Sequence, residues 1–261
     1  MKISRLSPQL GLGLVELMVA LVVSTFLLGG LIQIFIASKM SYRMLDGYSR
    51  LQENGRFAVD VLSKNIRLAG YRSDVSSNEE TVFPITTNGI IYGSDGQVII
   101  GSDGAVGSSD SITFRHQGSE DGLIEDCLGG DVDEGDTVSI TFSHDPVDNE
   151  LQCDVDGGTP QPLVDGVENM QILYGIDTSV PQDRFANVFL PAGPGLSWNN
   201  VVSVRIALLM NTVGSVSTQD DSKSYTLLSG VNGVNVAAAT DHFRRHRFVT
   251  TINLRNRVRL Q

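Results

Sequence analysis

The sequence is poor in positive charge relative to negative charge. Its 261 residues contain 19 Lys and Arg against 30 Asp and Glu, which gives a formal net charge of -11. Binding to the nucleic-acid backbone needs clustered Lys and Arg, so we expect no nucleic-acid partner. The hydrophobic fraction of 41% is nevertheless large enough to build a folded core.

Motifs of common catalytic and phosphate-binding sites are also lacking. The glycine-rich stretch at 101–107 has neither the lysine of a P-loop nor the G-x-G-x-x-G spacing. No G-x-S-x-G or H-E-x-x-H sequence occurs. We therefore expect neither an enzyme nor a cofactor.

Two short segments carry residue types that bind metals. The acidic segment 129–136 contains three aspartates, but Gly135 occupies a position where an EF-hand loop needs an oxygen ligand. His242 and His246 have the spacing of ligands on one helix face, but arginines surround them and oppose a divalent cation. We expect solvated turns at both places and no metal, and calcium in the central loops is the open alternative.

The longest apolar run lies near the N-terminus. Residues 12–37 contain one charged residue, Glu16, and follow residues 1–11, which carry Lys2 and Arg5 but no acid. About 20 apolar residues in a helix span a bilayer, whereas the apolar part of a secretory signal peptide has about 7 to 15. The basic N-terminal side predicts that this end stays in the cytoplasm and that the bulk of the chain is exported.

Glu16 is unusual, because a carboxylate in a lipid-embedded helix costs a few kcal/mol unless it has a partner. The surrounding segment, GLGLVELMVA, resembles the class III leader of type IV prepilins, which a prepilin peptidase cuts after Gly. In that family a Glu occupies the fifth mature position. Gly11 would then be the last leader residue, Leu12 the first mature residue and Glu16 the fifth. The resemblance implies cleavage after Gly11 and N-methylation of Leu12, although Phe is the usual residue at the first mature position.

Cleavage gives Glu16 a physical role. The new α-amine of Leu12 is cationic and lies in or beside the membrane, where Glu16 of a neighbouring subunit can pair with it. In a low dielectric an ion pair is strong, and either charge alone is penalised. We expect this pairing to set the register of the helices during assembly.

A second helical pattern continues the first. Residues 38–70 contain no proline, and apolar residues recur there at helical spacing on one face. These residues are Phe57, Ala58, Val61, Leu62, Ile66, Leu68 and Ala69. Gly70 is a natural stop. The expected divisions are a leader at 1–11, a membrane and assembly helix at 12–37, its amphipathic continuation at 38–70 and a globular domain at 71–261.

The rest of the chain consists of short β-branched runs separated by Gly, Asp, Asn and Ser. Such runs begin near residues 97, 111, 137, 168, 202 and 247. No internal repeat is visible. We expect an α+β fold in which the long N-terminal helix packs on an antiparallel β-sheet with long loops, in an extracytoplasmic domain.

Cys127 and Cys153 are the two cysteines of the chain, and no C-x-x-C occurs. In an exported domain such a pair predicts one disulfide. Two unrelated buried thiols are the alternative.

Arg244, Arg245 and Arg247 form a basic cluster in this acidic chain. The cluster either docks an acidic partner or lipid headgroups, or balances the acidic loops.

Several segments resemble the PilW group of minor pilins. They are 51–71, 163–177, 201–210 and 247–257, and with the leader they cover about half of the chain. The resemblance implies a type IV pilin-like fold and a minor pilin in a complex that primes pilus assembly, which supports twitching motility and adhesion. A type II secretion pseudopilin and a membrane-anchored periplasmic binding or hydrolytic domain are the alternatives.

The same resemblance implies the partners and the location. The partners would be other minor pilins, the major pilin, the prepilin peptidase, the inner-membrane assembly machinery and, before assembly, the lipid bilayer. The chain would cross the inner membrane once with its C-terminal domain in the periplasm, and would then enter the pilus fibre near its tip.

Overall fold

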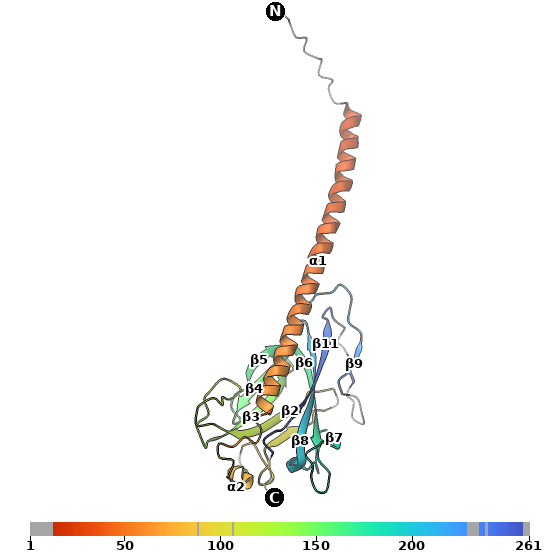
Figure 1. Cartoon of the computed structure of the whole chain (residues 1–261). Helices are drawn as coiled ribbons and strands as arrows, with labels where there is room; N and C mark the ends of the chain where they lie inside the picture. The colour runs from red at the N-terminus through yellow and green to blue at the C-terminus, as the bar shows by residue number, and fades with distance from the viewer. Residues whose placement is uncertain (1–12, 88, 106, 229–234, 238–239, 258–261) are drawn as a thin grey trace, which may run out of the picture. The chain divides into compact units, whose positions relative to one another are not determined.

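The computed structural model describes residues 13–87, 89–105, 107–228, 235–237 and 240–257. The predicted cleavage and methylation sites, Gly11 and Leu12, lie outside these residues. The chain divides into two compact units, 1–46 and 47–261. Helix α1, Leu14–Ile66, contributes residues to both units (Figure 1).

In the first unit, α1 presents apolar side chains all round. Its large apolar residues from Leu14 to Ile36 are each at least 51% exposed. In the described part of the chain, α1 is the one helix long and apolar enough to cross a membrane. A helix that is apolar on every side needs an apolar environment around it.

In the second unit, α1 is amphipathic. Leu51, Gly55, Ala58, Leu62 and Ile66 are buried at intervals of three or four residues, which places them on one face. The predicted buried stripe is therefore present, but Phe57 does not belong to it. Phe57 is 53% exposed, because it precedes Ala58 by one residue and lies about 100° away around the helix.

The helix ends close to the predicted stop. Residues 67–70 form turns, and Gly70 has a φ of 75°, which is the left-handed conformation that glycine adopts most easily. The Gly70 N–H donates to the carbonyl of Arg115 at 2.9 Å, so the end of the helix is fixed to a strand.

The described strands form three antiparallel sheets (Figure 1). The five-stranded sheet has the order β1-β2-β3-β4-β5, the four-stranded sheet has the order β11-β8-β6-β7, and β9 pairs with β10. The strands are β1 Ile99–Ser102, β2 Ser111–Gln117, β3 Thr137–Asp145, β4 Glu150–Val155, β5 Gln161–Asp165, β6 Val167–Ile176, β7 Val188–Leu190, β8 Val201–Asn211, β9 Ser224–Thr226, β10 Asn235–Ala237 and β11 Arg245–Asn253. Two short helices, α2 Glu79–Val82 and η1 Trp198–Asn200, complete the described elements. The predicted α+β fold is confirmed, with the strands divided among sheets.

One hydrophobic core joins α1 to both large sheets. Leu62 of α1, Phe114 of β2 and Ile206 of β8 all belong to it. A smaller cluster on the other face of the four-stranded sheet contains Leu209 and is covered by Leu227 from the β8–β11 connection. Because β6 has apolar neighbours on both faces, nearly all of its residues are buried.

Cys127 and Cys153 form the predicted disulfide. Cys127 belongs to the long connection between β2 and β3, and Cys153 is a buried residue of β4. The acidic, glycine-rich connection is thus attached covalently to the five-stranded sheet.

The connection before β2 joins the two large sheets through Asp110. Its backbone N–H donates to the carbonyl of Met170 at 2.8 Å. Its carboxylate accepts the N–H of Ile172 at 2.7 Å and the N–H of Gly104 at 2.9 Å. Burial raises the pKa of Asp110 to about 6, although these two hydrogen bonds favour the charged form.

The pH dependence of stability tests this junction. Between about pH 4 and pH 6 the folded state holds the Asp110 proton more tightly than the unfolded state does, so the stability due to this group decreases as pH rises. Asp110→Asn removes the titration and one N–H acceptor. We expect the variant to be less stable than the parent, with a difference that is largest near pH 4 and smaller near pH 7.

The free energy of unfolding would be measured on the full chain in detergent, with the fluorescence of Trp198, the single tryptophan, as the signal. Asp148→Asn, at an exposed turn, is the matched control and should leave the pH dependence of the free energy of unfolding unchanged. A difference between parent and Asp110→Asn that stays constant across this pH range would contradict the prediction.

Candidate functional site

The first candidate site is Glu16 in the first unit. It lies in the first turn of α1 and is the one charged residue from Leu14 to Ser38. The hydroxyls of Ser24 and Thr25 donate to backbone carbonyls one turn earlier, at 2.7 and 2.8 Å, so these polar groups are satisfied within the helix. Glu16 is thus the ionisable group of this apolar segment.

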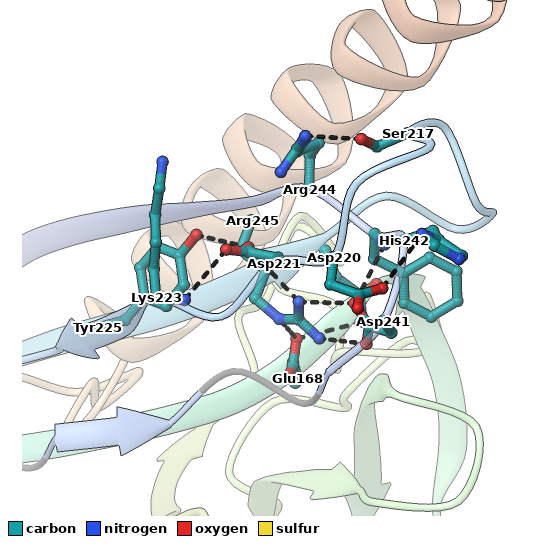
Figure 2. Close-up of polar contacts among 12 residues, drawn as sticks. Glu168, Ser217, Asp220, Asp221, Lys223, Tyr225, Asp241, His242, Arg244 and Arg245 are labelled. Atoms are coloured by element: carbon teal, nitrogen blue, oxygen red, sulfur yellow. Dashed lines mark hydrogen bonds and ion pairs between the residues drawn. The ribbon is translucent and has the colours of Figure 1, made fainter.

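The second candidate site surrounds Arg245, at the start of β11 (Figure 2). Its side chain is 1% exposed. The guanidinium donates to Glu168 of β6 at 2.5 Å and to the two carboxylate oxygens of Asp241 at 2.9 and 2.6 Å. Its Nη1 also lies 3.5 Å from Oδ2 of Asp221. Three carboxylates therefore surround one buried cation.

Further hydrogen bonds fix the carboxylates of this cluster. The hydroxyl of Tyr225 donates to Asp221 at 2.8 Å, and the backbone N–H of Asp221 donates to the carbonyl of Asp241 at 2.7 Å. Burial and the hydrogen bond to Asp221 raise the pKa of Tyr225 to about 12. Hydrogen bonds from Arg245 hold the pKa of Asp241 below its usual value. The cluster thereby attaches the β8–β11 connection to β6 and β11.

Arg244, Arg245 and Arg247, which were predicted to form one docking cluster, have three different environments in the structure. The docking role does not extend to Arg245, because its guanidinium is buried in ion pairs within the protein. Arg244 is half-buried and donates to the hydroxyl of Ser217 at 2.6 Å. Arg247 is exposed, and its guanidinium donates to the carbonyl of Thr226.

The carboxylates around Arg245 were not predicted from the sequence. Glu168, Asp221 and Asp241 are far apart along the chain, and only the fold brings them together. The one local signal was the spacing of four residues between Asp241 and Arg245, which form an ion pair. Acidic residues are frequent in this chain, so that spacing alone was not specific.

The segments with metal-binding residue types have other contacts. Nδ1 of His242 lies 3.4 Å from Oδ1 of Asp220, and the ring of His246 packs edge-on against Phe248. In the acidic connection, Asp126 accepts the backbone N–H groups of Leu128 and Gly130. Within the described ranges, no three His, Cys, Asp or Glu residues are placed to hold a metal ion.

The Arg245 cluster predicts a pH-dependent effect of mutation. Arg245→Met leaves buried carboxylates without their cation, which should destabilise the protein by about 3–5 kcal/mol near neutral pH. The loss should shrink below about pH 4, because protonated carboxyls no longer need the cation. Unfolding free energies at the two pH values measure both effects.

Arg244→Met is the matched control, since it removes an adjacent arginine that donates to a hydroxyl rather than to a carboxylate. It should cost less than about 1 kcal/mol. Equal losses in the two variants, or a loss in Arg245→Met that does not change with pH, would show that the ion pairs are not the source of the effect.

Two comparisons with known proteins found matches to this chain. Residues 147–256 match the sequence model of the family PilW, the type IV pilus-assembly protein W. This range contains Arg245 and its three carboxylate partners. No curated protein matches the chain.

The fold is similar to that of the type IV-like pilin TTHA1219 from Thermus thermophilus, with a TM-score of 0.50 and 15% sequence identity. The similarity covers 80% of this chain and 100% of that chain. An identity this low shows the fold alone. The predicted resemblance to the PilW group and the predicted type IV pilin-like fold are both confirmed. The match at 147–256 shows similarity to PilW over that range, and the structural match shows the fold.

Proposed function

We propose that this chain is a minor pilin that is cut after Gly11 and enters a small complex that primes assembly of a type IV pilus. The observation that carries the proposal is Glu16, a lone carboxylate in a helix segment whose large apolar side chains are all exposed. An isolated helix with this surface needs either lipid or other apolar helices around it. The type IV pilin fold and the PilW match support the same assembly.

In this proposal the chain first crosses the inner membrane once, with residues 47–261 in the periplasm. The prepilin peptidase then exposes the amine of Leu12, which becomes N-methylated. When the inner-membrane machinery moves the chain from lipid into the fibre, other pilins replace the lipid around α1. Glu16 pairs with the Leu12 amine of a neighbouring subunit, which removes both charges from an unfavourable environment.

The proposed position is the tip of the fibre, among other minor pilins that contact the major pilin. Twitching motility and adhesion would then depend on this chain through the presence of the pilus. The β-rich second unit selects neighbours through its surface, while the apolar helix supplies an attachment common to all subunits. These roles need no catalytic group.

The intact mass of the membrane-inserted protein tests the first step. Expressed with a prepilin peptidase, the chain should lose residues 1–11 and gain one methyl group. Without the peptidase its mass should be that of the full chain. An unchanged mass in both cases would identify an uncleaved membrane anchor and would remove the cationic partner of Glu16.

Replacement of Glu16 tests the assembly step. Glu16→Ala leaves the Leu12 amine of the neighbouring subunit unpaired, so incorporation into pili should fall by about tenfold or more, while membrane insertion and cleavage continue. Incorporation is measured by immunoblotting of sheared fibres, relative to the cell-bound chain.

Glu53→Ala is the matched control, because Glu53 is an exposed acid on the same helix in the second unit. It should be incorporated normally. Normal incorporation of Glu16→Ala would be incompatible with a pairing role. Loss of protein secretion with intact twitching in the deletion strain would indicate a secretion pseudopilin instead.

A further inference from the structure

The two large sheets end in four edge strands. These are β1 and β5 in the five-stranded sheet, and β7 and β11 in the four-stranded sheet. An edge strand has unpaired backbone N–H and C=O groups, so it can pair with a strand from another chain. Proteins usually prevent such pairing with short edges, prolines or bulges.

Three of the four edges have such protection. Strand β7 has three residues and is followed by Pro191. Strand β5 contains Pro162, and its pairing with β4 has a register shift. Strand β1 has four residues, one of which is Gly101. None of these edges offers a long, regular row of backbone groups.

Strand β11 has none of these protecting features. It has nine residues without proline or glycine, and all nine pair with β8 in one continuous register. Four consecutive residues, from Val249 to Ile252, are β-branched. This composition favours extended backbone and makes the edge regular.

Hydrogen bonds just beyond each end of β11 identify its outward groups. The N–H of Thr212 donates to the carbonyl of Arg244, and the N–H of Leu254 donates to the carbonyl of Val202. Hydrogen bonding alternates along an antiparallel pair, so even-numbered residues of β11 face β8. The backbone groups of Arg247, Val249 and Thr251 therefore point outward, and no bond from the described residues reaches them.

The side chains of these three residues are accessible. Val249 is 48% exposed, and Arg247 and Thr251 are also exposed. An incoming strand would thus meet a partly apolar surface that carries a cation. Arg255, just beyond the strand, is a second exposed cation. The local charge therefore favours acidic side chains on whatever pairs with this edge.

We propose that the outer edge of β11, at Arg247, Val249 and Thr251, binds an extended, acid-bearing segment of another protein chain as an additional strand. Backbone hydrogen bonds to these residues supply affinity, and Arg247 selects acidic side chains. The inference does not require the proposed function. Where the chain is part of a pilus, the added strand would belong to a neighbouring subunit.

A peptide probe tests the proposal on the full chain in detergent. The probe is a short, fluorescently labelled peptide in which Glu alternates with Val, and a second peptide has Lys in place of Glu. The acidic peptide should bind at least about tenfold more tightly than the basic one. Its binding should slow hydrogen exchange of the outward amides of Arg247, Val249 and Thr251.

Two variants separate charge from backbone pairing. Arg247→Glu should reverse the preference between the two peptides, whereas Arg184→Glu, which changes the net charge equally at an exposed loop residue, should not. Val249→Pro removes one outward N–H and should weaken binding of the acidic peptide by about tenfold. If Trp198 fluorescence shows that Val249→Pro unfolds the chain, the peptide preference of Arg247→Glu still tests the proposal.

The proposal is overturned if the acidic peptide does not bind, if Arg184→Glu has the same effect as Arg247→Glu, or if bound peptide leaves exchange of the outward amides unchanged. None of these results depends on cleavage after Gly11 or on Glu16. Failure of the edge site and failure of the pilin assignment are therefore distinguishable.

Discussion

The packing of α1 against both large sheets is the interaction on which the second unit depends. The helix supplies Leu51, Ala58, Leu62 and Ile66 to a core that also receives residues from β2 and β8. Each fully buried side chain of the Leu or Ile type contributes about 1.5–3 kcal/mol. At Gly55 the absence of a side chain leaves room for the ring of Phe248, which an added Cβ would overlap.

Three buried arginines of the second unit, Arg115, Arg245 and Arg257, each have different partners. Arg245 has three carboxylates around it. Arg257 pairs with Glu79 at 3.1 Å. Arg115 donates to the carbonyls of Gln97 and Phe83 and lies 4.0 Å from the ring centroid of Tyr92. These guanidinium groups neutralise carboxylates or bond backbone carbonyls inside the protein, so they add no positive charge to its surface.

The elements that the sequence predicted are those with strong local patterns. The buried stripe around Leu62, the stop near Gly70 and the six β-branched runs all have a periodicity or turn chemistry that acts over a few residues. Strands β4, β5, β7, β9 and β10 were not predicted, because they are short and because all of them except β7 contain polar residues or proline. The disulfide was predicted because only two cysteines were available.

The parts that could not be predicted depend on long-range contacts. The division of the strands between two large sheets follows from which strands pair, and Asp110 and Arg245 act through partners that are distant in sequence. The exposure of Phe57 depends on where the sheets meet the helix, which no local pattern specifies. The importance of Glu16 can be predicted from the sequence because it is local: Glu16 is one charge within a long apolar run.

The order of the elements along the chain also affects when this unit can fold. The helix is made first, but Phe248, which packs beside Gly55, lies close to the other end of the chain, and Asn256 donates to the carbonyl of Arg67 at 2.9 Å. During synthesis, the face of α1 that is buried in the folded unit therefore lacks part of its cover until β11 has been made. For that interval the chain exposes apolar helix surface that the folded unit buries, and transiently exposed apolar surface favours aggregation.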